Sequence, residues 1–153
     1  MTNNDCLRRI RYILDFNDSK MIAIFGLANV TTDRKEVSAW LKQDDDTGFE
    51  KCSDASFAAF LNGMIIALRG EKEGEPPRVE IKLNNNMVFM KLKIALSLKA
   101  DEILKILESA GQEISKHELS AFFRRPDHKH YRECKDQILR NFLNGLKINY
   151  RDD

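Results

Sequence analysis

The sequence predicts an all-α protein built by tandem duplication of a four-helix unit, and three observations support this prediction. Helix-forming residues dominate the composition, with three prolines and seven glycines in 153 residues. Apolar residues recur at spacings of three and four along most of the chain, which is typical of helices with one buried face. The segment 52–63 (CSDASFAAFLNG) returns at 134–145 (CKDQILRNFLNG) with the same Phe-Leu-Asn-Gly end.

The duplication extends beyond that segment. Residues 3–64 align with residues 85–146 without a gap, at a constant offset of 82 positions, and 15 of the 62 pairs are identical. Typical composition would give roughly four identical pairs by chance. Both copies begin with an Asn-Asn pair, at Asn3 and Asn85. We therefore expect two copies of one helical fold, packed about a pseudo-two-fold axis.

Three parts follow from this alignment: a first helical repeat over residues 1–70, a linker over 71–84 and a second repeat over 85–150. The linker starts with an acidic run that contains glycine and two prolines, EKEGEPP, which is typical of a connection between folded units. Its later residues, VEIKL, alternate apolar and charged side chains. That alternation permits a short extended segment.

The first two helices of each repeat are predicted from their apolar spacing. The first helix covers about 5–15 and again about 88–98, and the second covers about 19–28 and again about 101–110. Gly111 follows the second helix of the second repeat. Glycine suits the left-handed conformation that ends many helices, so we expect that helix to end there.

The third helix of each repeat opens with the pattern of a capping box. The first repeat has Asp33 followed three residues later by Glu36, and the second has Ser115 followed by Glu118. In a capping box the first side chain accepts a hydrogen bond from the backbone three residues on, and the second reaches back to the first residue's N–H.

The last helix of each repeat follows a polar connection, at 44–53 and 126–135, and carries an apolar stripe that runs through an Asn-Gly pair. A glycine inside a helix costs about 1 kcal/mol relative to alanine, and a close approach of another helix usually offsets this cost. We therefore expect the two final helices to pack against each other. The residues of this expected interface are Phe60, Gly63, Phe142 and Gly145.

Charge and apolar length exclude several classes of protein. The net charge is +1, with −3 on residues 1–76 and +4 on residues 77–153, which is weaker than the strongly basic balance of a dedicated nucleic-acid-binding protein. The longest apolar stretches fall well short of the roughly 20 residues of a membrane-spanning helix. Charged residues near the N-terminus argue against a signal peptide. We therefore expect a cytoplasmic protein with no membrane partner.

The three cysteines are too few and too widely spaced for a disulfide framework. Cys52 and Cys134 occupy equivalent positions of the two repeats. We expect both to be small buried apolar residues.

Three strings of sequence resemble a known family. They are the Asn-Asn start, ALSLKADEIL at 95–104 and RRPDHKHYRECKDQ at 124–137. Together they resemble the YehS-like family of bacterial proteins of uncharacterised function, over nearly the whole chain. This resemblance implies a duplicated domain and a cytoplasmic bacterial protein, and it supplies no catalytic or binding residues.

Residues with possible chemistry gather before the last helix of the second repeat. His130 and Cys134 stand four apart and would share one face of a helix, but a structural zinc site takes four ligands, and the first repeat has Asp46 and Gly48 in place of the histidines. A nucleophilic Cys134 assisted by His128 or His130 would need a partly exposed thiol, whereas the pattern predicts a buried one. No phosphate-binding loop or nucleophile elbow occurs. The sequence therefore predicts no enzyme, no cofactor and no metal.

A helix-turn-helix is the alternative that implies nucleic-acid binding. It would use residues 101–125, with Gly111 in the turn. Against it, His117 and Ser120 occupy positions where that motif places apolar residues, and the first repeat has three consecutive aspartates, 44–46, that would repel phosphate. Nucleic-acid binding is therefore possible and less favoured.

The favoured hypothesis is a non-catalytic interaction module that uses a basic face of the second repeat to bind an acidic partner. The sequence leaves the partner and the oligomeric state open. The residues of this face are Lys116, Arg124, Arg125, Lys129 and Arg132.

Overall fold

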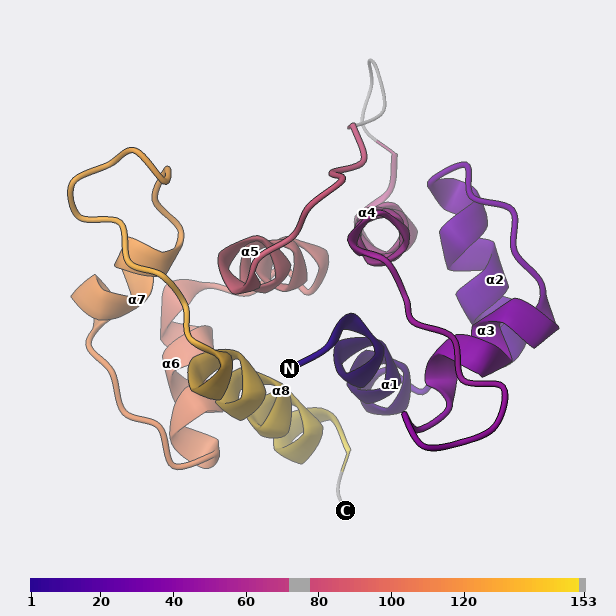
Figure 1. Ribbon diagram of the computed structural model, residues 1–153. Coiled ribbons are helices and arrows are strands. Elements are labelled where there is room, and N and C mark those ends of the chain that lie inside the picture. The colour runs from indigo at the N-terminus through magenta and orange to yellow at the C-terminus, as the bar shows by residue number, and fades with distance from the viewer. Residues whose placement is uncertain (72–77, 152–153) are drawn as a thin grey trace. The chain divides into compact units, whose positions relative to one another are not determined.

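The computed structural model describes residues 1–71 and 78–151, and this part of the chain contains eight α-helices and no strand (Figure 1). The helices are α1 (Asn3–Ile13), α2 (Asp18–Leu27), α3 (Arg34–Leu41), α4 (Asp54–Arg69), α5 (Asn85–Ala95), α6 (Ala100–Ser109), α7 (Lys116–Phe122) and α8 (Asp136–Tyr150). The predicted all-α class is confirmed, and the order of the helices repeats at the offset of the internal duplication.

The chain divides into two compact units, Met1–Leu83 and Asn84–Asp153. Residues 78–84 contain no regular element, and the Ile81 side chain among them is 82% exposed. No strand is therefore formed in this described part of the linker. Residues 72–77 of the linker lie outside the described residues.

Polar side chains fix the starts of the third helices, in two different ways. In the second repeat Ser115 and Glu118 form the predicted capping box, with distances of 3.0 and 3.2 Å between donor and acceptor atoms. In the first repeat Asp33 accepts from the Glu36 N–H at 2.8 Å, but the Glu36 carboxylate accepts from the Thr32 hydroxyl at 2.9 Å. The predicted box is thus only half formed there. The second repeat has an isoleucine at the position of Thr32, which offers no competing hydroxyl.

Left-handed residues end the first two helices at equivalent positions of the repeats. Asp15 and Ser97, both with φ of 55°, follow the first helices. Asn29 with φ of 63° and Gly111 with φ of 82° follow the second helices, which confirms the predicted role of Gly111. The backbone therefore turns in the same way in both units even where the residue types differ.

Two equivalent core positions exchange phenylalanine and leucine between the repeats. Phe25 in α2 of the first repeat stacks against Trp40 and Phe60, with ring centroids 5.2 Å apart in each pair. The second repeat has a leucine at the position of Phe25 and instead places Phe89 in α5, 4.5 Å from the Phe142 ring, where the first repeat has Leu7. This exchange of a large and a smaller side chain between two helices is the kind of swap that a packed core tolerates.

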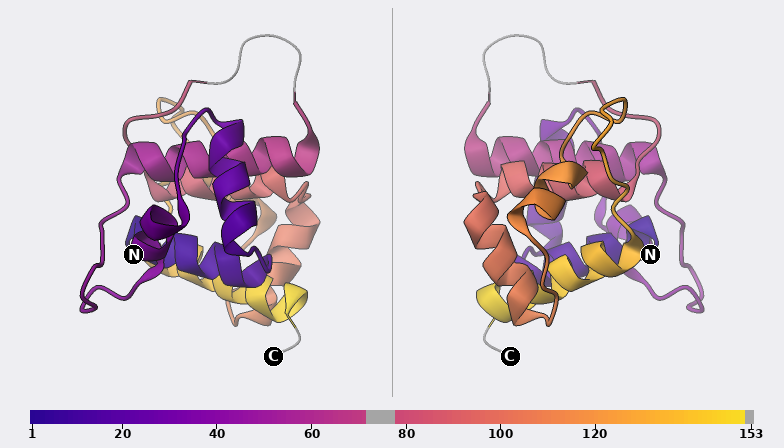
Figure 2. Two further views of the ribbon diagram at one scale, coloured as in Figure 1. Left: turned by 90° about the vertical axis from the view of Figure 1, so that its right-hand side faces the viewer. Right: turned by 90° about the vertical axis from the view of Figure 1, so that its left-hand side faces the viewer.

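Within each repeat the last helix packs across the second helix, α4 on α2 and α8 on α6 (Figure 2). The asparagine and glycine of each Asn-Gly pair lie inside the last helix, as predicted. A Cβ atom added at Gly63 would lie 2.0 Å from the Ile24 carbonyl oxygen, and one added at Gly145 would lie 2.1 Å from that of Ile106. The close helix approach predicted for these glycines is therefore present.

The neighbour predicted for these glycines is wrong. The space beside each glycine is filled by the second helix of the same repeat, where we expected the last helix of the other. Phe60 and Phe142 likewise contact rings of their own repeat. The physical reason is that each four-helix unit must bury its own apolar stripes, and its second helix supplies the backbone surface on which the glycine lies.

The glycines give a direct test of this packing. Gly63→Ala or Gly145→Ala places a methyl group against a backbone carbonyl that cannot turn aside, and we expect a loss of about 2–3 kcal/mol in the free energy of unfolding. Gly26→Ala in α2 is the matched control, because nothing lies within 4 Å of its added Cβ. We expect it to be neutral or to stabilise by up to about 1 kcal/mol. Urea denaturation of the three variants measures both effects, and equal stability of all three would contradict the packing.

Candidate functional site

Two loops at equivalent positions form the candidate site and its counterpart. We call residues 42–53, between α3 and α4, the first loop, and residues 124–135, between α7 and α8, the second loop. The second loop is orange in Figure 1. Three backbone hydrogen bonds of the first loop recur at the equivalent positions of the second, so the two loops share these turns, although Gly48 has a φ of 88° and His130 at the equivalent position is not left-handed. In the first loop they are Asp46 N to Gln43 O, Phe49 N to Asp46 O and Glu50 N to Ala39 O.

A buried asparagine fastens the first loop to α1. The Asn4 side chain is 1% exposed, and its amide donates to the carbonyl oxygens of Trp40 and Glu50, both at 2.9 Å. Its carbonyl oxygen accepts from the Cys52 N–H at 3.0 Å. One side chain thus satisfies three backbone groups, one at the end of α3 and two in the loop.

The second loop is fastened in the same way. The Asn86 amide donates to the carbonyl oxygens of Phe122 and Arg132 at 3.0 and 2.8 Å, and its carbonyl oxygen accepts from the Cys134 N–H at 2.9 Å. We call this three-bond arrangement, at Asn4 and at Asn86, the asparagine latch. It gives a structural role to the Asn-Asn start that is common to both repeats.

The preceding asparagine extends each latch to the start of the last helix. Asn3 donates to the Cys52 carbonyl oxygen at 3.1 Å and to the Asp54 carboxylate at 2.7 Å, and Asn85 makes the corresponding two bonds in the second repeat. The Asp54 carboxylate also accepts from the Leu83 N–H at 2.9 Å. The hydrogen bonds from Asn3 and Leu83 hold the pKa of Asp54 below its usual range.

The cysteines of the two loops belong to the cores. The Cys52 and Cys134 residues are 0% and 1% exposed, as predicted. Burial raises the pKa of each thiol to about 12, so both are neutral thiols near pH 7. His128 and His130 are exposed, and the described residues of the second loop lie outside helix α8. Cys134 and His130 therefore do not share a helical face.

The two loops carry opposite charge on this common backbone. The first loop has two basic and four acidic residues, a net charge of −2, whereas the second has five basic and two acidic residues, a net charge of +3 with its histidines neutral. At one equivalent pair of positions, Glu50 and Arg132, the charge is inverted although both residues are held by the same backbone bonds.

The structure brings the predicted basic residues together around the second loop. Arg125, Lys129 and Arg132 are exposed and Arg124 is half-buried. Lys116 lies in the first turn of α7, and the neighbouring His117 ring is 6.5 Å from the His130 ring of the loop. That turn is therefore beside the loop.

Acidic neighbours neutralise this face only in part. Lys116 lies 3.5 Å from Asp101, and Arg125 lies 3.5 Å from Asp127. All four side chains are more than two-thirds exposed, so each pair contributes little to stability and can exchange partners. The basic groups of the face remain accessible to an external carboxylate.

A gathering of histidines at this face was not expected from the sequence. His130 lies beside both of the others: its ring is 6.5 Å from the His117 ring and 5.6 Å from the His128 ring, and its N–H donates to the His128 Nδ1 at 3.0 Å. Sequence spacing gave no signal that His117 would join them. Within residues 1–71 and 78–151, no group of three or more His, Cys, Asp or Glu side chains is placed to hold a metal ion.

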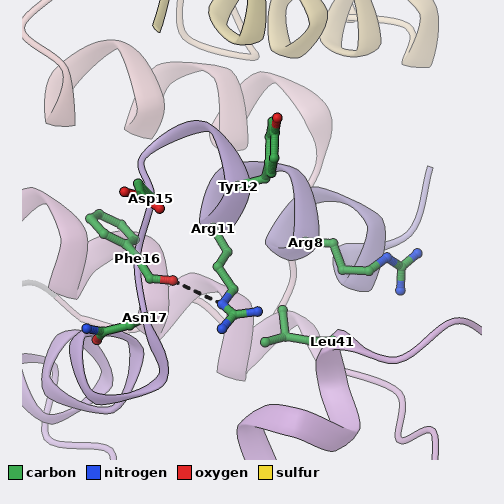
Figure 3. Close-up of a pocket in the computed structure, with 7 residues that line it drawn as sticks. All are labelled: Arg8, Arg11, Tyr12, Asp15, Phe16, Asn17 and Leu41. Carbon is green, nitrogen blue, oxygen red and sulfur yellow. Dashed lines mark hydrogen bonds between the residues drawn. The ribbon is translucent and has the colours of Figure 1, made fainter. Parts of the chain in front are cut away.

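The first repeat also has an open pocket of about 480 Å³ (Figure 3). It is lined by Arg8, Arg11, Tyr12, Asp15, Phe16, Asn17 and Leu41. Figure 3 shows Arg11 folded back onto the Phe16 carbonyl oxygen, to which its Nε donates at 3.0 Å. Arg11 also donates to Asp18, and Arg8 donates to the Lys42 carbonyl oxygen at 2.7 Å. These guanidinium groups hold α1 to its neighbouring segments, so the pocket offers little free charge.

Helices α6 and α7 are the two helices of the helix-turn-helix alternative. Helices α6 and α7 pack together with a turn between them. Helix α7 has seven residues, about 10 Å at 1.5 Å per residue, which is short for a helix that reads a major groove. The same corner in the first repeat, α2 and α3, leads into the acidic first loop.

None of the helices that the structure describes is both long and apolar enough to cross a membrane.

Comparisons with known proteins support the duplication independently. The family model with the description "Protein of unknown function (DUF1456)" matches the chain twice, over residues 3–70 and 85–152. The chain is 45% identical over 147 residues to "Uncharacterized protein YehS" of Escherichia coli (strain K12), which covers 95% of this chain and 94% of that protein. No solved structure matches the chain. The resemblance to the YehS-like family and the internal duplication are thereby confirmed.

The asparagine latch predicts a specific loss of stability. Asn4→Ala or Asn86→Ala leaves one backbone N–H and two carbonyl oxygens without their partner, and we expect a loss of about 3 kcal/mol in the free energy of unfolding. Asn3→Ala removes two bonds from a more exposed site and is expected to cost clearly less. Chemical denaturation measures the free energy of unfolding of each variant and so ranks the three losses. A loss at Asn4 no larger than that at Asn3 would show that the latch does not hold the loop.

The thiols predict both a reactivity and a dependence on pH. Because Cys6, Cys52 and Cys134 are all buried, none should react with a disulfide reagent at pH 8 until the chain unfolds. Unfolded thiols ionise near pH 9, whereas folded Cys52 and Cys134 stay protonated to about pH 12. Their stabilising contribution is therefore complete below about pH 9 and is lost as the pH rises toward 12.

The control for this pH dependence is the double variant Cys52→Ala and Cys134→Ala. It should lose stability less steeply than the natural chain between pH 9 and pH 12, although it starts from a lower value because two small cavities are created. Rapid reaction of Cys52 or Cys134 in the folded chain would contradict the burial described above. So would an equally steep loss of stability between pH 9 and pH 12 in the natural chain and the double variant.

Proposed function

The chain belongs to the DUF1456 family of proteins of unknown function, and from this premise we propose that it is a non-catalytic binding module whose second loop binds an acidic partner. The observation that carries the proposal is the opposite net charge of two loops that share three equivalent backbone hydrogen bonds. Each latch joins its loop and the end of the preceding helix to the first helix of the repeat by three hydrogen bonds, so the charged side chains are presented from a fastened loop. Binding residues are often found on loops positioned in this way by a rigid scaffold.

The exposure of the basic groups supports an external partner. Among the described residues, Lys129 and Arg132 make no ion pair within 4 Å, and the pair of Arg125 with Asp127 is open to solvent. An acidic partner would find several accessible cations within one loop. Electrostatic complementarity of this kind steers association and selects partners more than it adds affinity.

A non-catalytic role is supported by the chemistry of the loop. Its cysteine is a buried, protonated thiol, which lacks the ionised form that nucleophilic catalysis needs. The cytoplasmic location expected from the N-terminal sequence stays a prediction, and so does nucleic-acid binding through α6 and α7.

Reversal of charge in the second loop tests the proposal. We expect the natural chain to bind fluorescently labelled poly-L-glutamate at low salt, with affinity that falls as salt is added. Arg125→Glu with Lys129→Glu should weaken this binding at least about tenfold, because attraction is replaced by repulsion. Fluorescence anisotropy provides the measurement.

The matched control changes the same net charge in the first repeat. Lys20→Glu with Lys35→Glu alters two exposed lysines that belong to neither loop and should leave binding nearly unchanged. An equal loss in both double variants would mean that overall charge, and not the second loop, attracts the probe. Tighter binding to mixed-sequence DNA than to poly-L-glutamate would favour the helix-turn-helix alternative.

A further inference from the structure

We infer that the acidic partner of the second loop is the first loop of another copy of this chain, an inference that rests on the proposed function. The two loops are complementary in charge, at −2 and +3. They are also presented on the same scaffold. Each copy would then carry both halves of the contact.

The first loop offers carboxylates that the fold leaves accessible. Asp44, Asp45 and Glu50 are exposed, and among the described residues none of them forms an ion pair within 4 Å. Asp46 differs from them, because its carboxylate accepts from the Gln43 N–H at 3.1 Å and so belongs to the turn. Three exposed carboxylates are therefore available to a partner.

The second loop offers the matching cations. Arg132 stands where the first loop has Glu50, and its carbonyl oxygen and N–H make the same two bonds, to the latch asparagine and to the alanine of the preceding helix. Arg125 and Lys129 belong to the same loop and are exposed. The two loops thus carry opposite net charge, with Glu50 and Arg132 of opposite sign at one pair of equivalent positions.

When the first loop of one copy binds the second loop of another, each of the two copies keeps one loop unbound. Such a head-to-tail contact continues into chains or closes into rings. Its attraction acts between solvent-exposed groups and is screened over about 10 Å at 0.1 M salt. We therefore expect weak association that depends on both protein concentration and salt.

Sedimentation velocity of the full chain tests this expectation. At about 20 mM salt the weight-average mass should rise with protein concentration, and at about 300 mM salt it should stay that of the monomer. A first-loop variant (Asp44→Lys, Asp45→Lys and Glu50→Arg) and a second-loop variant (Arg125→Glu, Lys129→Glu and Arg132→Glu) should each stay monomeric at low salt. Their association constants should be at least about tenfold weaker than that of the natural chain.

Mixing the variants gives the decisive measurement. The first-loop variant has two basic loops and the second-loop variant has two acidic loops, so an equimolar mixture should form complexes that neither variant forms alone. The chain with all six substitutions should associate as the natural chain does, because its charges are exchanged and remain complementary. Circular dichroism of each variant checks that the helices are retained.

Three results would overturn the inference. They are a natural chain that stays monomeric at every concentration at low salt, a mixture that does not associate, and a first-loop variant that associates undiminished. If the chain stays monomeric while the second loop still binds poly-L-glutamate, the inference fails and the proposed function stands. If the second loop binds neither poly-L-glutamate nor another copy of the chain, both the inference and the proposed function fail.

Discussion

A buried side-chain amide in each repeat is the constraint on which the rest of the structure depends. The loop between the third and last helices is long and polar, and its backbone groups would be costly to bury without partners. Asn4 and Asn86 supply those partners from the first helix, with three hydrogen bonds each. Each latch therefore closes the four-helix unit and sets the path of its loop at the same time.

The close contact of the last helix with the second is the apolar counterpart of the latch. Gly63 and Gly145 remove the side chain at the crossing, so that a backbone carbonyl of the second helix can approach. The isoleucine that supplies this carbonyl is one of the residues identical in the two repeats, at Ile24 and Ile106. Both contacts, the glycine against the isoleucine carbonyl and the buried amide of the latch, thus use residues that are identical in the two repeats.

Positions outside these contacts differ more between the repeats, and the charged residues of the two loops are an example. Exposed charges on a latched loop contribute little to stability, so they can change sign without loss of the fold. Glu50 and Arg132 illustrate this, because both keep their backbone bonds and differ in charge. A duplicated unit of this kind presents two surfaces of unlike charge from one scaffold, and that property underlies the proposed binding role.

The sequence by itself determined the class, the duplication, the helices and the burial of Cys52 and Cys134, because apolar spacing and local caps act over a few residues. It also identified the basic residues of the second loop, since charge can be counted. Tertiary structure decided the rest. Periodicity showed that Gly63 needs a close neighbour but could not say that the neighbour is Ile24, and composition gave no reason for the paired asparagines to contact Trp40 and Cys52. Contacts between residues distant in the chain depend on how the helices fold back on one another, and no local pattern encodes that.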